Sequence, residues 1–255
     1  MRITTVQSSL VWEKVDLNLQ SFEKKMESLK NQTDIIVLPE MFSTGFSMNP
    51  EKLSESFEDS KTIDWMKNMA AKTNAAICGS LIIEENGNYY NRFIWAAEGK
   101  IEYYDKRHLF TLAGEHKYYK AGEKKLIITY KDWRICPQVC YDLRFPAWCR
   151  NSEDFDIQIF VANWPNKRSH HWKSLLLARA IENQCYVVGV NRVGKDANDL
   201  EYSGHTSIID FAGNIAYQKA YVEEVMTVEI SKEKLDNFRN KLNFLTDRDT
   251  FEIKR

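Results

Sequence analysis

Short runs of apolar and β-branched residues recur along the whole chain. Such runs, bounded by polar residues, are typical of β-strands. They predict strands at 3–6, 34–38, 75–83, 93–97, 126–130, 157–161, 185–190, 206–210 and 226–230. A further short apolar run ends at Cys140, where charged residues follow at once. This is the pattern of a buried strand that leaves the core.

Helical spacing appears between several of these runs. Apolar residues repeat every three or four positions in two segments, which predicts amphipathic helices. They are Val15, Leu19, Phe22, Met26 and Leu29 in the first, and Leu235, Phe238, Leu242 and Leu245 in the second. Two more helices are expected at 65–71 and 172–181, the latter after Ser169 as N-cap.

The alternation of strands and helices predicts an α/β fold. A turn signal at 97–100 lies between two strand-like runs, so some strands should pair antiparallel. A mixed sheet or two packed sheets would fit this order. The chain has 255 residues, 5 Pro and 10 Gly, and no Pro- or Gly-rich linker divides it. We therefore expect a single domain over 1–255.

The charge composition mainly excludes some classes of binding partner. The chain has 35 basic and 36 acidic residues, with a net charge of -1 and no long run of one sign. A nucleic-acid partner or a polybasic membrane contact is therefore not expected. The first residues lack the apolar core of a signal peptide, and no apolar stretch reaches the roughly 18 residues that span a bilayer. We expect a cytoplasmic protein.

The five cysteines lie at 78, 136, 140, 149 and 185. Their odd number and the absence of a C-x-x-C pair argue against a disulfide framework and against a zinc site. A buried cysteine is most often a small hydrophobic residue. Cys140 differs because it ends a strand, where α/β folds hold reactive side chains, and a thiol forms covalent intermediates readily.

Two charged residues could activate this thiol. Glu40 follows the apolar run 34–38, and a buried carboxylate can exchange protons near pH 7 as a general base. Lys106 follows another strand-like stretch, and an ammonium group can stabilise a thiolate or an oxyanion. Glu40 could equally be a strand-end residue that is solvated or caps a helix, and Lys106 taken alone is more often a solvated surface charge. His108 is the second choice as a partner for Cys140, because nothing in the sequence pairs the two.

At this point the motifs resemble a known family. Segments 39–46 (PEMFSTGF), 106–110 (KRHLF) and 140–146 (CYDLRFP) look like the three signature blocks of the carbon-nitrogen hydrolase, or nitrilase, superfamily. Segments 162–165 (ANWP), 177–184 (LARAIENQ), 190–194 (VNRVG) and 202–206 (YSGHT) are similar to its omega-amidase branch of the bacterial YafV type. The resemblance runs from Ile3 to about Phe251, and the order of the blocks makes it specific.

The resemblance implies a catalytic triad of Glu40, Lys106 and Cys140, which agrees with the roles inferred from the residues. It also implies a second active-site glutamate at Glu115, for which an exposed loop carboxylate is the alternative. The backbone N–H of Tyr141 would join Lys106 in holding an oxyanion. The fold implied is a four-layer α-β-β-α sandwich with two mixed sheets between helices.

The implied activity is that of an amidohydrolase without metal or organic cofactor. It would release ammonia from small 2-oxo acid amides, such as 2-oxoglutaramate or 2-oxosuccinamate, through a cysteine thioester. Arg168 precedes a predicted helix and could bind the substrate carboxylate, unless it is a surface charge. Trp164 and Phe46 are further candidate substrate-binding residues.

Some alternatives stay open. The chain could act on other aliphatic or N-carbamoyl amides, or it could be a catalytically silent member that binds small amides or a protein partner. Many family members have glycine where this chain has Gln138, which would reshape the pocket wall. Asp142 and Arg144 are interpreted as a structural ion pair, and His170 and His171 as packing or capping residues. The family usually forms dimers, so segment 231–255 could be part of a homodimer interface.

Overall fold

Residues 1–254 are described by the computed structural model, and their strands form two sheets of seven strands each. The first sheet has the order β14-β1-β2-β4-β5-β6, and β3 pairs with β4. Its central strands β1, β2 and β4 are parallel, whereas β14, β5 and β6 pair antiparallel. The bounds are β1 (Arg2–Gln7), β2 (Ile35–Val37), β3 (Glu55–Ser56), β4 (Ala76–Glu85), β5 (Asn88–Ala97), β6 (Lys100–Asp105) and β14 (Glu224–Glu229).

The second sheet has the order β11-β12-β10-β9-β8-β7, and β13 pairs with β12. Strands β8, β9 and β10 are parallel, and β7 and β12 add antiparallel on either side. The bounds are β7 (Ile128–Tyr130), β8 (Trp133–Val139), β9 (Ile157–Ala162), β10 (Tyr186–Asn191), β11 (Val193–Lys195), β12 (Glu201–Ile209) and β13 (Ile215–Ala220). Both sheets are therefore mixed.

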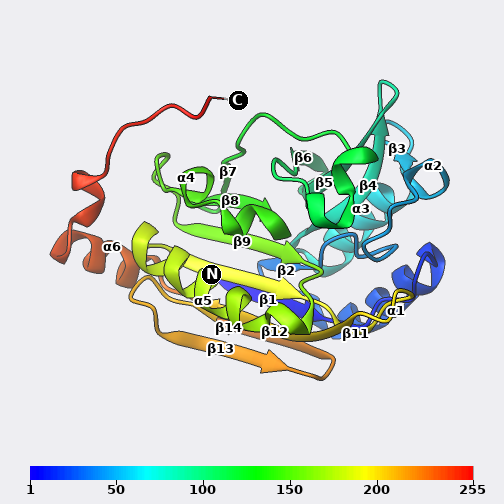
Figure 1. Cartoon of the computed structure of the whole chain (residues 1–255). Coiled ribbons are helices and arrows are strands. Elements are labelled where there is room, and N and C mark those ends of the chain that lie inside the picture. Colours follow the sequence, from blue (N-terminus) through cyan, green and yellow to red (C-terminus); the bar gives the residue numbers. More distant parts are fainter. Residues whose placement is uncertain (255) are drawn as a thin grey trace.

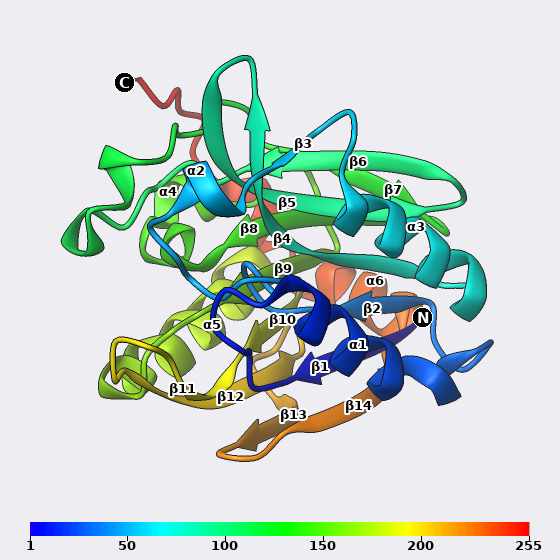
Figure 2. The same ribbon diagram turned by 90° about the vertical axis from the view of Figure 1, so that its right-hand side faces the viewer.

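The sheets pack face to face, and helices cover their outer faces (Figure 1). α1 (Val15–Met26) and α3 (Lys61–Thr73) contact each other, and α3 packs on β4 and β5 of the first sheet (Figure 2). α5 (Ser169–Asn183) packs on β10 and β12, and α6 (Lys232–Lys241) follows β14. This is the four-layer α-β-β-α sandwich that the resemblance implied. The short helices are α2 (Pro50–Leu53) and α4 (Pro146–Cys149).

The strand β2 shows why the apolar runs are continuous. Ile35 and Val37 belong to the core between the sheets, whereas Ile36 packs with the core under α1 and α3. Successive side chains of a strand point to opposite faces, so a strand covered on both faces needs apolar residues at every position. Burying each such side chain stabilises the fold by roughly 1.5–3 kcal/mol. The buried strands thus bring their carboxyl ends to a fixed place at the edge of the core.

Most predicted elements are confirmed, with some corrections. The turn at 97–100 joins β5 to β6, with Ala97 opposite Lys100. Ser169 is not an N-cap but the first residue of α5, whose cap residue makes no side-chain hydrogen bond. The helix predicted at 65–71 starts four residues earlier, because the Ser60 side chain accepts a hydrogen bond from Ile63 N and caps it. β13 was missed because none of its residues is buried and Gln218 and Lys219 interrupt its apolar positions.

Within residues 1–254, no helix has the length and apolar character needed to cross a bilayer.

Candidate active site

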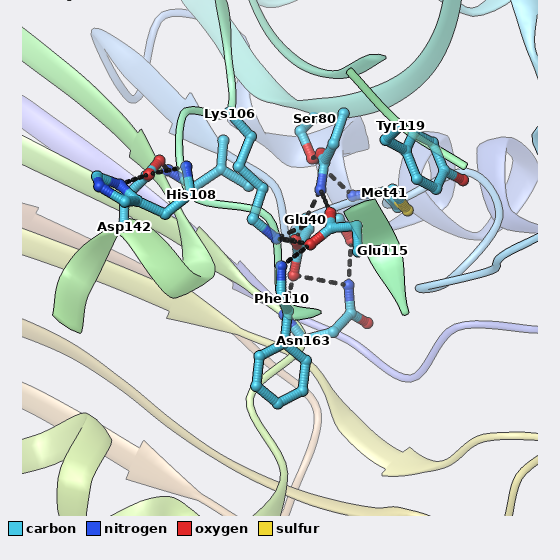
Figure 3. A network of polar contacts seen from close by, with 12 residues as sticks. Glu40, Met41, Ser80, Lys106, His108, Phe110, Glu115, Tyr119, Asp142 and Asn163 are labelled. Atoms are coloured by element: carbon cyan, nitrogen blue, oxygen red, sulfur yellow. Dashed lines mark hydrogen bonds and ion pairs between the residues drawn. The ribbon is translucent and has the colours of Figure 1, made fainter. Parts of the chain in front are cut away.

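Three strand ends bring the predicted charged and thiol groups to one place. Glu40 follows β2, Lys106 follows β6 of the same sheet, and Cys140 follows β8 of the second sheet. Glu115 is the first residue of a short 3-10 turn, η3 (Glu115–Lys117). Glu40, Lys106 and Glu115 are all fully buried (Figure 3). The alternatives of a solvated lysine or an exposed loop carboxylate are therefore wrong.

Lys106 lies between two carboxylates. Its Nζ is 2.9 Å from Glu40 Oε1 and 3.0 Å from both oxygens of Glu115 (Figure 3). Burial alone would lower the pKa of Lys106, but the negative charges of Glu115 and Glu40 outweigh it and raise that pKa well above its ordinary value. The lysine is therefore a permanent cation in the site. Burial raises the pKa of Glu115, against the opposing effect of Lys106.

Glu40 is held in place by further hydrogen bonds. Asn91 Nδ2 donates to Glu40 Oε1 at 2.8 Å and to Glu115 Oε1 at 3.1 Å. Asn163 donates from its backbone N–H to Glu40 Oε2 at 2.8 Å, and from Nδ2 to the Glu40 carbonyl at 2.6 Å. Ser80 Oγ in turn donates to Asn91 Oδ1 at 2.8 Å. Both oxygens of the Glu40 carboxylate are thus fixed in direction.

Cys140 has a constrained backbone at the end of β8. Its φ of 45° lies in the left-handed region, which residues other than glycine rarely adopt. Its side chain is buried but borders a cavity. Burial and then the negative charge of Glu40 raise the pKa of the Cys140 thiol well above its usual value, against the opposing effect of Lys106. At neutral pH the resting group is therefore a thiol beside a carboxylate, and not a preformed thiolate.

The cavity beside Cys140 has a volume of about 500 Å³, and six of the residues that line it are aromatic. Candidate residues Phe46, Tyr141, Trp164 and Arg168 all line it. Its other lining residues include Trp12, Glu13, Met48, Phe110, Arg144, Asn163, Asp196, Asn198, Leu200 and Tyr202. Apolar walls with a few polar groups are typical of small-molecule sites.

The expected ion pair between Asp142 and Arg144 is wrong. The fully buried Asp142 carboxylate accepts from Tyr104 OH at 2.8 Å and from Val139 N at 3.1 Å through Oδ2. Its Oδ1 accepts from His108 N at 2.9 Å and lies 2.8 Å from His108 Nδ1. Arg144 faces the cavity instead. Side chains two positions apart on a helical turn point in different directions, which explains the separation.

His108 therefore contacts Asp142, and its ring stacks on Phe145 at 3.7 Å. Gln138 does not shape the pocket wall as expected. It is fully buried and its Nε2 lies 3.4 Å from Cys136 Sγ. His170 and His171 are both exposed, and His171 Nδ1 lies 3.1 Å from Arg144 Nη2.

Two functional candidates were missed by the sequence. Asn91 lies in β5 between Tyr90 and Arg92, outside the strand predicted at 93–97, so the local sequence did not indicate that it is buried. Asn163 follows β9 and belongs to segment 162–165, whose sequence alone indicates no role for it. Both contact Glu40. Within residues 1–254, no cluster of three or more His, Cys, Asp or Glu side chains has an arrangement that could bind a metal ion.

Comparisons with known proteins agree with this geometry. The family model described as carbon-nitrogen hydrolase matches residues 2–240. Omega-amidase YafV of Yersinia enterocolitica is 44% identical over 98% of both chains. The 2-oxoglutaramate amidase of Bacillus subtilis is 33% identical over 96% of both chains. A crystal structure of a CN-hydrolase superfamily protein from Xanthomonas campestris, with an arsenic adduct in its active site, has a TM-score of 0.97 and 43% identity, covering 100% of this chain and 99% of the other.

Proposed function

The chain belongs to the carbon-nitrogen hydrolase family, and from this we propose that it is an omega-amidase that releases ammonia from the terminal amide of small 2-oxo acid amides. It is a hydrolase of amide carbon-nitrogen bonds. One observation carries the proposed chemistry: a fully buried Lys106 ammonium lies within 3.0 Å of two buried carboxylates, beside a cysteine at a strand end.

Acylation begins with Glu40 as general base. The raised pKa of Cys140 means that the thiol has to lose its proton as it reacts, and Glu40 accepts that proton. The sulfur attacks the amide carbon, a C–S bond forms, and the carbonyl π electrons move to the oxygen. The net charge of the site is conserved, because the proton only moves from sulfur to the carboxylate.

The oxyanion then needs donors that are already in position. The Lys106 ammonium and the backbone N–H of Tyr141 are the proposed donors, since Lys106 remains charged and Tyr141 follows the nucleophile on the same turn. Removing one donor of this kind typically costs roughly 3–4 kcal/mol of transition-state stabilisation. Glu115 supports this role because both of its carboxylate oxygens accept hydrogen bonds from Lys106 and hold the ammonium in place.

The second half of the reaction reuses the same groups. Glu40 gives its proton to the nitrogen, the C–N bond breaks, and ammonia leaves a thioester on Cys140. A water molecule then attacks this thioester while Glu40 accepts one of its protons. The C–S bond breaks, and the thiolate recovers its proton from Glu40. The products are a 2-oxo dicarboxylic acid and ammonia, and the new carboxyl group passes its proton to ammonia in water to give ammonium.

The proposed substrates are 2-oxoglutaramate and 2-oxosuccinamate, which carry a carboxylate at the end opposite the amide. Support comes from the names of the relatives and from Arg168, which lines the cavity. Arg168 ends the turn η5 (Asn166–Arg168) directly before α5, and its guanidinium lies 5.2 Å above the ring of Phe110. A planar guanidinium can bind a carboxylate through two hydrogen bonds.

Incubation of the purified protein with 2-oxoglutaramate tests the function. Ammonia should be released, Cys140→Ser should abolish the release, and the intact mass should show an acyl adduct during turnover. Cys78→Ala is a matched control, because Cys78 is another buried thiol without a place in the site. Absence of ammonia from this substrate, from glutamine, from succinamate and from simple nitriles would reject the enzyme proposal.

We also propose that residues 1–255 form a single domain and that the protein is located in the cytoplasm. We further propose that it forms a homodimer through segment 231–255. Support for the dimer comes from exposed apolar residues there: Phe244, Phe251 and Ile253 are 60%, 46% and 39% exposed. Exposed apolar groups in one segment often indicate a protein contact. Light scattering should give twice the chain mass, and Phe244→Lys with Phe251→Lys should reduce it to the monomer. A monomeric mass for the unaltered protein would reject the dimer.

A further inference from the structure

Arg144 is a cation in the cavity without a counterion. Asp142 cannot neutralise it, because four donors from Tyr104, Val139 and His108 already occupy that carboxylate. Among residues 1–254, no carboxylate oxygen lies within 4.0 Å of the Arg144 guanidinium. Its one side-chain hydrogen bond goes to a ring nitrogen of His171, at 3.1 Å. The positive charge is therefore free to bind a ligand.

Trp164 links Arg144 to Arg168. The Arg144 guanidinium lies 4.8 Å above the Trp164 ring, and Trp164 Nε1 donates to the Arg168 carbonyl at 2.8 Å. The Trp164 side chain is almost fully buried, so it offers a rigid support. The Arg168 guanidinium is supported by the ring of Phe110. Two guanidinium groups, each packed on an aromatic ring, thus line one cavity.

We propose that Arg144 is a specificity-determining residue that binds the 2-oxo oxygen of the substrate, while Arg168 binds the carboxylate. This inference rests on the proposed function. In a 2-oxo acid amide, the 2-oxo group lies between the amide and the carboxylate. Arg144 lies on the turn that begins at Cys140, η4 (Cys140–Arg144), and Arg168 lies on a separate turn. Arg144 thus shares the turn of the nucleophile, and we assign it to the 2-oxo group because that group lies nearer the amide than the carboxylate does.

This arrangement also discriminates against 2-amino acids. A guanidinium group only donates hydrogen bonds, so it stabilises an oxo oxygen but repels an ammonium group in the same position. The cavity also contains Asp196 and Glu13, which could attract an ammonium group. Asp196 already accepts from two backbone N–H groups of its own loop and from Tyr202 OH, and Glu13 accepts from Ser47 Oγ. The two arginines are the cations that line the cavity, and hydrogen bonds hold Asp196 and Glu13 to neighbours of their own.

Two substrates that differ only at this group provide the test: 2-oxoglutaramate and glutaramate, which has the same length and carboxylate but no 2-oxo oxygen. The unaltered protein should prefer 2-oxoglutaramate in kcat/KM by roughly 10- to 150-fold, the range for a hydrogen bond to a charged group. Arg144→Ala should bring this ratio close to one. Arg168→Ala should lower kcat/KM on both substrates and preserve the ratio, because both carry the carboxylate.

Arg107→Ala is the matched control. Its guanidinium also packs on a tryptophan, at 4.5 Å from the Trp148 ring, but Arg107 does not line the cavity. The substrate ratio should therefore stay at its normal value in this variant. If Arg144→Ala does not fold, Arg144→Met serves in its place, since it preserves most of the length of the side chain and removes every hydrogen-bond donor.

The outcomes separate this inference from the proposed function. If the unaltered protein hydrolyses 2-oxoglutaramate but the Arg144 variants retain its substrate ratio, the assignment of Arg144 is overturned and the amidase proposal stands. Equal rates of the unaltered protein on 2-oxoglutaramate and glutamine would likewise overturn only the assignment. Absence of ammonia from all three substrates would overturn the proposed function, and the role of Arg144 with it.

Discussion

His108 Nδ1 lies 2.8 Å from Asp142 Oδ1, and this contact joins the segment after Lys106 to the turn that begins at Cys140. The carboxylate is fully buried and has no lysine or arginine partner within 4.0 Å among residues 1–254. Its stability in the core therefore depends on the number of donors around it. The contact also explains why His108, although it is two residues from Lys106, is not a partner of the nucleophile.

Replacement of His108 should therefore reduce stability. His108→Leu removes one donor from a buried carboxylate, so we expect a loss of about 1.5–3 kcal/mol in the free energy of unfolding. His108→Asn should lose less, because its amide nitrogen can take the position of Nδ1. Urea unfolding measures both values. His116→Leu, at an exposed position, is the control, and an equal loss in both leucine variants would contradict this role.

Glu40→Gln should have two separate effects, one on the pKa of the Cys140 thiol and one on kcat. The negative charge of Glu40 raises the pKa of Cys140, so its removal should lower that pKa and allow the thiolate to form at a lower pH. The loss of the general base should nevertheless reduce kcat by about 100- to 10,000-fold. Absorbance of the thiolate at ultraviolet wavelengths, with Cys140→Ser subtracted, gives the titration midpoint. Exposed Glu51→Gln is the control. A midpoint that stays or rises would contradict the role of Glu40.

Glu115→Gln should lower kcat more than it changes KM. An amide at this position would turn a donor toward the Lys106 ammonium, which now lies 3.0 Å from both oxygens. The ammonium should shift, and misplacing one oxyanion donor reduces kcat by about 100- to 1,000-fold. Steady-state kinetics on 2-oxoglutaramate measure this effect, with exposed Glu58→Gln as the control. A raised KM at unchanged kcat would indicate a role in substrate binding instead.

The sequence predicted the groups that follow strands but not their partners. Glu40 and Cys140 could be selected as candidates because each stands where an apolar run ends, and Lys106 because it follows a strand-like stretch. These are local patterns, and the family resemblance joined the three residues into a triad. Asn91 reaches Glu40 only because β4 lies between β2 and β5 in the sheet, and no local pattern contains that order. Opposite charge suggested a pairing of Asp142 with Arg144, yet the direction of the side chains on a helical turn decides such contacts. Contacts between residues that are far apart in the sequence could therefore be identified only from the structure.

Gly204 and Gly87 allow a test of how tightly β12 packs against β1. Their φ angles are 70° and 72°, so alanine is strained by its backbone to a similar extent at both positions. A Cβ at Gly204 would lie 2.0 Å from Gln7 Oε1, whereas a Cβ at Gly87 would meet no atom within 4 Å.

Gln7 cannot move away freely from an added methyl group at Gly204. Its Oε1 accepts from Thr206 N at 3.1 Å, and its Nε2 donates to the Val222 carbonyl at 2.7 Å. Gly204→Ala should therefore destabilise the fold by about 1–3 kcal/mol more than Gly87→Ala, which is the range for overpacking a core. Urea unfolding of the two variants measures this difference directly. Equal losses would mean that Gln7 adapts at no cost, and that its two hydrogen bonds do not fix the position of β12 beside the cavity.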